Sequence, residues 1–83
     1  MSHGPCLLTR PGCGLCDEFH AEWRAAFPGI ELPRLDVDRD AQLRQRFGDT
    51  IPVLLGERDQ EVCRVHFDRA ACAPLAARLS GAG

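Results

Sequence analysis

Two cysteines separated by two residues are the part of this chain best suited to chemistry. Cys13 and Cys16 follow the apolar run 6–8 and stand where a helical pattern begins. Residues three positions apart lie on one face of a helix, so the two sulfurs can close a small disulfide ring. Cys13 would lie at the helix N-terminus, where unpaired N–H groups and the helix dipole favour a thiolate. Because the thiolate attacks disulfides, the spacing predicts redox chemistry, with half of a metal site as the second hypothesis.

Length and composition limit the other possibilities. A chain of 83 residues makes one domain with one modest core, so we expect a single domain over residues 1–83. The net charge is −2 and the ten arginines are scattered, which argues against a nucleic-acid partner. No apolar run approaches the ~18 residues of a membrane span, and residues 1–5 lack the features of a signal peptide. We therefore expect a cytoplasmic protein without a membrane partner, in a compartment that keeps thiols reduced.

The hydrophobic pattern in the first half predicts a strand, a helix and a second strand. Residues 5–9 form a short apolar strand, and residues 14–27 place Cys16, Phe19 and Trp23 on one helical face. Residues 30–37 then read as a second strand. Pro33 within it indicates a sheet edge or an irregularity, because proline cannot donate a ladder hydrogen bond.

The second half predicts a helix, a hairpin and a last helix. Asp38 is the expected N-cap of the second helix, and Gly48 is expected in the left-handed C′ position after it. Residues 53–55 and 61–65 are short strands joined by a polar loop, so they should pair antiparallel.

Asp68 is the expected N-cap of the last helix. Pro74 predicts a kink there, or a helix start nearer Cys72. The whole order is β-α-β-α-β-β-α, which gives an α/β fold with a four-stranded mixed sheet flanked by helices.

With these elements in place, the chain resembles the thioredoxin fold, and glutaredoxins in particular. The Cys13-Gly-Leu-Cys16 motif after the first strand and Thr50-Ile51-Pro52 before the third carry this likeness. Within that superfamily the chain is most similar to small bacterial glutaredoxin-like domains of unknown function. The stretches 9–19, 36–40 and 48–55 carry this closer match.

The resemblance implies roles for individual residues. It makes Cys13 the nucleophile and Cys16 the resolving cysteine of a thiol–disulfide oxidoreductase. Pro52 matches a proline that is cis in the family, and Thr50 and Ile51 precede it. The backbone of Ile51 would pair with a thiol substrate as a strand does. Arg10 stands where a basic residue often precedes the motif, and its charge would lower the pKa of Cys13.

The resemblance also has departures that bear on the partner. Many glutaredoxins have two glycines after the fourth strand, followed by a polar residue and an aspartate, and there they hold the glutathione carboxylate. This chain has Val65-His66-Phe67-Asp68 and no glycine pair. We therefore expect reduction of a protein or glutathione mixed disulfide by a monomer that is reset by a cellular thiol reductant. We expect no bound cofactor, and glutathione stays an alternative co-substrate.

Two further function hypotheses remain open from the sequence. The chain could be a binding module without turnover that docks a partner strand beside Ile51 and Pro52. It could instead carry zinc or an iron–sulfur cluster through Cys13 and Cys16, with the missing ligands coming from a dimer or from glutathione.

The other three cysteines are expected in or near the core, since unmodified cysteine is commonly buried. They are Cys6, Cys63 and Cys72. A bridge between Cys63 and Cys72 remains an alternative, because the fourth strand leads into the last helix.

Overall fold

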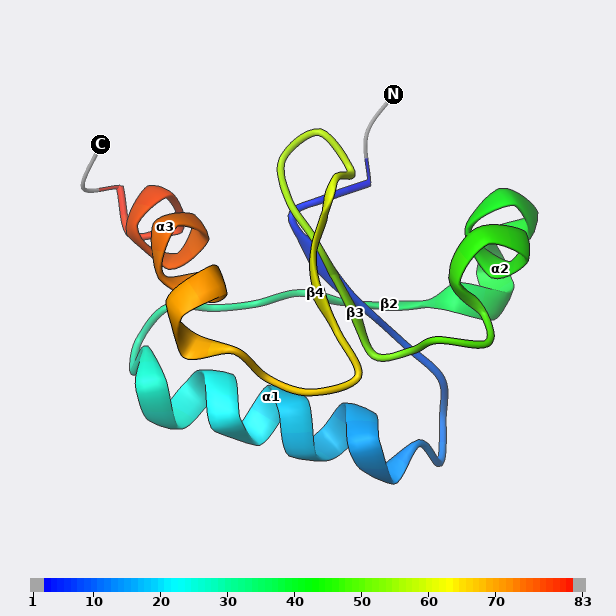
Figure 1. The fold of residues 1–83 in the computed structure, drawn as a ribbon, viewed down its shortest axis with the longest axis horizontal. Coiled ribbons are helices and arrows are strands. Elements are labelled where there is room, and N and C mark those ends of the chain that lie inside the picture. Colours follow the sequence, from blue (N-terminus) through cyan, green and yellow to red (C-terminus); the bar gives the residue numbers. More distant parts are fainter. Residues whose placement is uncertain (1–2, 82–83) are drawn as a thin grey trace.

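The computed structural model describes residues 3–81 and contains four strands and four helical segments. Three α-helices surround the strands, and a short 3₁₀-helix, η1, precedes α2 (Figure 1). In chain order the elements are β1 (Cys6–Thr9), α1 (Gly14–Ala26), β2 (Arg34–Asp36), η1 (Val37–Arg39), α2 (Ala41–Phe47), β3 (Val53–Leu55), β4 (Glu61–Arg64) and α3 (Arg69–Leu79).

The four strands form one mixed sheet in the order β2-β1-β3-β4. β1 pairs parallel with β2 and antiparallel with β3, and β3 pairs antiparallel with β4. This topology confirms the predicted α/β fold with a four-stranded mixed sheet flanked by helices.

Each face of the sheet has its own core, which explains why the residues of the two central strands are apolar except for Thr9 at the end of β1. Leu7 and Leu54 point to the face covered by α1 and α3, where they pack with Phe19, Trp23 and Leu75. Their chain neighbours point to the opposite face, which η1 and α2 cover (Figure 1); that core contains Cys6, Leu8, Val37, Leu43, Phe47, Val53 and Leu55. Successive side chains of a strand point to opposite faces, so apolar residues are favoured at successive positions when both faces are buried.

Aspartate side chains begin three of the helical segments. Asp36 accepts from the backbone N–H of Asp38 at 2.9 Å and begins η1. Asp40 accepts from Leu43 at 3.0 Å and begins α2. Asp68 caps α3 as the sequence predicts. The prediction of Asp38 as an N-cap is wrong. Asp36, Asp38 and Asp40 stand at alternate positions, and because the 3₁₀ turn η1 lies between them, Asp36 caps η1 and Asp40 caps α2.

The second strand is shorter than its sequence pattern indicates. β2 contains only Arg34–Asp36, and residues 30–33 approach β1 through one bond, from the Leu7 N–H to the Pro33 carbonyl at 2.8 Å. Val37, predicted as a strand residue, is instead fully buried in η1. The lack of an N–H on Pro33 accounts for the late start of the ladder.

Two predictions about helix ends also need correction. α3 starts at Arg69 rather than near Cys72 and continues through Pro74. Gly48 has φ −56° and ψ −27°, a helical conformation and not the expected left-handed one. Glycine is needed there for another reason: a Cβ at this position would clash with the carbonyl of Arg44.

Within residues 3–81, no helix is both long enough and apolar enough to cross a membrane. The predicted absence of a signal peptide concerns residues 1–5, and residues 1 and 2 lie outside the described part of the chain.

His3 ties the start of the chain to two distant acidic groups. Its Nε2 lies 2.7 Å from an Asp40 carboxylate oxygen, and its Nδ1 lies 3.2 Å from Asp59. The hydrogen bond with Asp59 is the main cause that raises the pKa of His3 above its ordinary 6.5. The pKa of Asp40 is lowered from 3.8, chiefly by the Leu43 N–H. That of Asp59 is also lowered, because backbone N–H and His3 bonds outweigh its partial desolvation.

The contacts of His3 predict a pH-dependent contribution to stability. Because the folded pKa is raised, the contribution is complete below pH 6.5 and declines as pH rises through the folded pKa. Protonation of Asp40 and Asp59 removes the contact only in acid, below about pH 3.8, because the pKa values of both carboxyl groups are lowered from 3.8. We expect His3→Gln to lower the urea midpoint more at about pH 5.5 than at about pH 9. An equal difference at both pH values would contradict the charged contact.

Candidate active site

A tight turn connects β1 to the cysteine motif. The Cys13 N–H donates to the Arg10 carbonyl at 3.1 Å, closing a turn with Pro11 and Gly12 at its centre. Gly12 has φ +80°, and proline followed by a glycine of positive φ is the pattern of a type II turn. A Cβ at Gly12 would meet nothing within 4 Å, so glycine is required there for its backbone angle and not for space.

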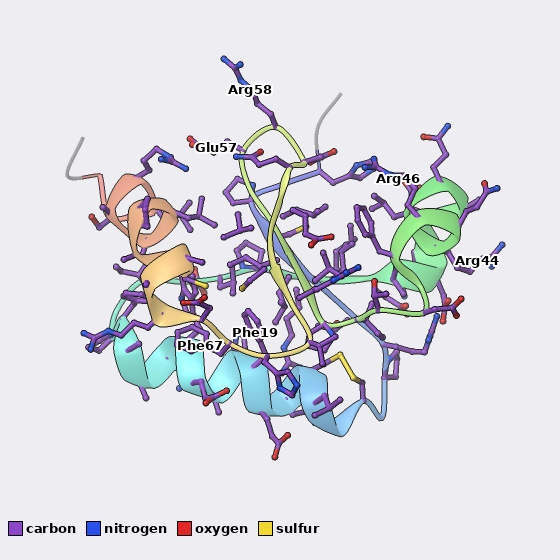
Figure 2. All side chains as sticks on the ribbon, viewed as in Figure 1. Phe19, Arg44, Arg46, Glu57, Arg58 and Phe67 are labelled. Carbon is purple, nitrogen blue, oxygen red and sulfur yellow. A yellow bond between two sulfur atoms is a disulfide. The ribbon has the colours of Figure 1, made fainter. Side chains whose placement is uncertain are left out.

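Cys13 is also the N-cap of α1. Its backbone is extended, and its Sγ accepts from the Cys16 N–H at 3.1 Å, as a serine or aspartate oxygen does at other helix starts. Cys13 and Cys16 are joined by a disulfide, with their Cα atoms 5.2 Å apart (Figure 2, yellow bond at the start of α1).

The two sulfur-bearing residues differ in access to solvent. Cys13 is half-buried, whereas Cys16 is only 1 % exposed and packs toward the core. A disulfide-containing reagent can therefore reach Cys13 more readily than Cys16. This is the arrangement that an attacking and a resolving cysteine need.

Two charged side chains beside the motif, Arg10 and Asp17, are paired. The Arg10 guanidinium donates to the two Asp38 carboxylate oxygens at 2.7 and 2.8 Å, and to the Gly48 carbonyl at 3.3 Å. Asp17, in the first turn of α1, forms an ion pair with Arg34 at 3.0 Å. The pairing raises the pKa of Arg10 and lowers that of Asp38.

This pairing bears on the prediction that Arg10 lowers the pKa of Cys13. The carboxylate of Asp38 offsets the guanidinium charge at close range, so Arg10 mainly fastens the motif loop to η1 and to the end of α2. The helix N-terminus and the Cys16 N–H remain as the nearest groups that favour a Cys13 thiolate.

The segment Thr50-Ile51-Pro52 ends at the same end of the sheet as the motif. Leu8 lies opposite Val53 in the antiparallel register, so Pro52 follows on directly toward Thr9, the last residue of β1. The Ile51–Pro52 peptide bond is cis, as the resemblance implies. Thr50 folds back on α2 through backbone and hydroxyl bonds to the Phe47 carbonyl, at 2.9 and 3.1 Å. The expected contact of Ile51 with substrate stays a prediction.

The chain after β4 closes the same end of the molecule. The Val65 N–H donates to the Pro52 carbonyl at 2.7 Å, and the His66 N–H donates to the Arg64 carbonyl at 2.7 Å. Val65 has φ +65°, which is rare for a β-branched residue. Phe67 then stacks edge-on against Phe19 of α1, with ring centroids 5.4 Å apart (Figure 2). The backbone thus takes a glycine-like conformation although the glycine pair is absent.

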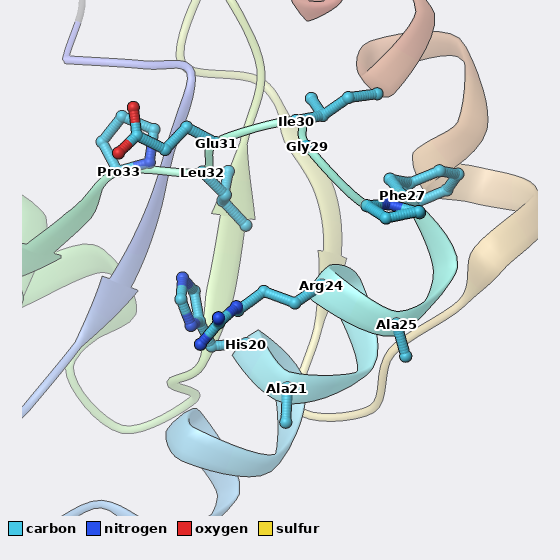
Figure 3. A pocket seen from close by; sticks show the side chains of 11 residues that line it. His20, Ala21, Arg24, Ala25, Phe27, Gly29, Ile30, Glu31, Leu32 and Pro33 are labelled. Carbon is cyan, nitrogen blue, oxygen red and sulfur yellow. The ribbon is translucent and has the colours of Figure 1, made fainter.

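An open pocket lies away from the motif, at the junction of α1 with the chain that leads to β2. It has a volume of about 950 Å³; His20 projects from α1 toward the segment that carries Leu32, and the Arg24 side chain runs along the helix toward His20 (Figure 3). Burial and the charge of Arg34 lower the pKa of His20. None of the predicted site residues lines this pocket. His20 therefore belongs to a different surface from the cysteine motif.

The remaining cysteines are thiols, and two of them are in contact. Cys6 is buried, and its desolvation raises the pKa to about 11. The sulfurs of Cys63 and Cys72 lie 3.5 Å apart, within hydrogen-bond distance but without a disulfide bond. In the described part of the chain, no three His, Cys, Asp or Glu side chains are grouped so as to hold a metal ion.

Comparison with sequence families agrees with this geometry. The family described as Glutaredoxin-like domain (DUF836) matches residues 6–80. The chain belongs to this family. No curated protein and no solved structure matches the chain. Membership in a glutaredoxin-like family and a cysteine pair at disulfide distance together fit a thioredoxin-fold redox role.

Sequence reasoning missed three features of this glutaredoxin-like site. They are the Arg10–Asp38 pair, the γ-turn at Val65 and the exposure of Leu15, whose relative accessibility is 46 %. The first depends on contact between residues 28 positions apart. Only the third had a local signal, since Leu15 lies off the apolar stripe that contains Cys16 and Phe19.

The Arg10–Asp38 pair yields a test of the local electrostatics. Asp38→Asn should lower the pKa of reduced Cys13 by a few tenths of a pH unit, because the guanidinium charge loses its offset but remains partly screened. The double variant Arg10→Gln/Asp38→Asn should return the pKa close to that of the parent. Both can be measured by pH-dependent alkylation of Cys13 in a Cys16→Ser background. An unchanged or raised pKa in Asp38→Asn would mean that the pair does not influence Cys13.

Proposed function

We propose that this glutaredoxin-like protein is a thiol–disulfide oxidoreductase that reduces protein or glutathione mixed disulfides. The observation that carries the proposal is the asymmetry of the motif. Cys13 is half-exposed at the N-cap of α1, and its disulfide partner Cys16 is buried one turn further along. The prediction of a cytoplasmic monomer without bound cofactor, supplied with electrons by a cellular thiol, is part of the same proposal.

The reaction proceeds through two exchanges. The Cys13 thiolate attacks one sulfur of the substrate disulfide, forms a mixed disulfide and releases the other sulfur as a thiolate. Cys16 then loses its proton, and its sulfur attacks Cys13 Sγ, which releases the second substrate thiolate. The substrate gains two electrons and, with two protons, becomes two thiols, while Cys13 and Cys16 become a disulfide. An external dithiol, or two monothiols, restores the reduced enzyme by the reverse exchanges.

The local structure supports each exchange. The Cys16 N–H that reaches Cys13 Sγ at 3.1 Å, together with the helix N-terminus, favours the thiolate that starts the reaction and leaves at its end. The short Cα–Cα distance of 5.2 Å lets the resolving step occur without backbone rearrangement. Beside the motif, the backbone of Ile51 is our candidate for aligning the substrate chain.

Replacing each cysteine of the motif should give a different result. Cys13→Ser should remove most of the rate on a glutathionylated peptide, because it removes the sulfur at the helix N-terminus, where a thiolate is favoured. Cys16→Ser should still react once and accumulate the mixed disulfide on Cys13, which mass spectrometry detects. Cys6→Ala is the matched control and should retain activity, since the Cys6 thiol is buried with a pKa of about 11. Full activity in Cys13→Ser would refute the assignment of the nucleophile.

The exposed side chain between the cysteines bears on the substrate. Leu15 is the large apolar residue that the described structure leaves exposed, and it stands next to the sulfur that would be attacked. Covering its exposed half with a protein substrate would contribute about 1 kcal/mol of transition-state stabilisation. This arrangement favours protein disulfides with apolar neighbours over small polar disulfides.

Leu15→Ser should therefore separate the two substrate classes. We expect kcat/KM to fall about fivefold on a protein disulfide with apolar flanks. The value for hydroxyethyl disulfide should hardly change, since this reagent is too small to cover Leu15. Ala25→Ser, an exposed change near the other end of α1, serves as the control. An equal decrease on both substrates would mean that Leu15 affects the motif itself and not substrate contact.

A further inference from the structure

A second pair of cysteines lies between β4 and α3, separate from the Cys13–Cys16 motif. Cys63 Sγ and Cys72 Sγ are 3.5 Å apart, although nine positions separate the two residues in the chain. Cys72 belongs to the core between the sheet and α1/α3, and Cys63 packs against that core from β4. Both are thiols in this structure.

We propose that Cys63 and Cys72 form a second dithiol that reacts with low-molecular-weight disulfides and closes to a disulfide between β4 and α3. The contact distance carries the proposal. The two sulfurs are already at van der Waals contact, so a movement of about 1.5 Å brings them to the ~2.05 Å of a disulfide bond. The proposal does not rest on the activity of Cys13 and Cys16.

Burial assigns different roles to the two thiols. Cys63 is half-buried on the edge strand β4, whereas Cys72 is 0 % exposed. The hydrogen bond between the sulfurs lowers the pKa of Cys63, and it raises the pKa of Cys72. Cys63 is therefore the thiol that meets the reagent, and Cys72 is the thiol that resolves the adduct.

The reaction with oxidised glutathione consists of two exchanges. The Cys63 thiolate attacks one glutathione sulfur, forms a Cys63–glutathione mixed disulfide and releases the other glutathione as a thiolate. Cys72 then loses its proton, and its sulfur attacks Cys63 Sγ and releases the second glutathione. Two electrons pass from the cysteine pair to one glutathione disulfide, which becomes two glutathione thiols. No other oxidant is needed.

Closing this bond would change the properties of the fold. Residues 63–72 would become a covalent loop that fastens the start of α3 to the free edge of the sheet. A disulfide restricts the unfolded chain, and for a loop of this length Tm should rise by on the order of 10 °C. The state of the second dithiol would thus set how firmly α3 and the neighbouring residues 65–68 are held.

The test uses a Cys13→Ser/Cys16→Ser protein, in which the motif cannot take part. The folded protein is incubated with oxidised glutathione, its remaining thiols are alkylated in denaturant, and it is digested with trypsin. Arg64 and Arg69 lie between the two cysteines, so a Cys63–Cys72 bond joins the peptides 59–64 and 70–78. We expect these joined peptides from monomeric protein, with a Tm above that of the reduced sample.

Single replacements test the order of the two steps. Cys72→Ala should retain one glutathione on Cys63, because no second thiol resolves the adduct. Cys63→Ala should leave Cys72 unmodified, because Cys72 is buried. If Cys63 and Cys72 are both alkylated after the glutathione treatment, the proposal is wrong. It is equally wrong if a stable glutathione adduct accumulates on Cys63 while Cys72 is present, and neither result would affect the function proposed for Cys13.

Discussion

The central position of β1 is the constraint on which the rest of the structure depends. The strand pairs with β2 on one side and β3 on the other, and its side chains alternate between two cores. A strand held on four sides cannot slip by one residue without moving Leu7 and Leu8 into the wrong cores. The end of β1 is therefore fixed in space. The short turn at Gly12 then places Cys13 at a defined position beside it.

The chemistry of the motif depends on how its surroundings are paired. Arg10 and Asp17 are charged residues close to the cysteines, and each is bound by a partner of opposite sign from another element. Exposed ion pairs of this kind contribute little to stability. Because these two charges are offset by their partners, the backbone N–H groups at the start of α1 remain as a local group that favours a thiolate on Cys13. We therefore expect the reactivity of Cys13 to depend mainly on the helix N-terminus.

The sequence was sufficient for the parts of the fold that have local causes. The cysteine spacing, the proline and glycine of the turn, and Asp68 before an apolar helix each predict structure within a few residues. The failures share a different cause. Asp36, Asp38 and Asp40 are equivalent candidates for capping until the 3₁₀ turn selects between them. Strand β2 is short because of Pro33, whose consequence for the ladder depends on the neighbouring strand.

The site was harder to predict than the fold because it is built from contacts between distant residues. The pairing of the strands brings the Val65 N–H to the Pro52 carbonyl, and no local sequence pattern predicts this contact. A γ-turn with positive φ at a valine costs of order 1–2 kcal/mol. It is retained here because the Val65 N–H bonds to Pro52, Phe67 packs on Phe19 and Asp68 begins α3.

The two cysteine pairs differ in their surroundings, and the difference follows from where each pair lies in the fold. Cys13 and Cys16 lie at a helix N-terminus beside a loop, where N–H groups point at sulfur and a reagent can approach. Cys63 and Cys72 lie between a strand and a helix, where desolvation raises the pKa of both thiols. Their mutual hydrogen bond offsets this rise for Cys63 and adds to it for Cys72. Each pair has one half-buried and one buried cysteine, but in the first pair the helix N–H groups favour a thiolate. A thiol reagent should distinguish them by rate before any difference in equilibrium becomes visible.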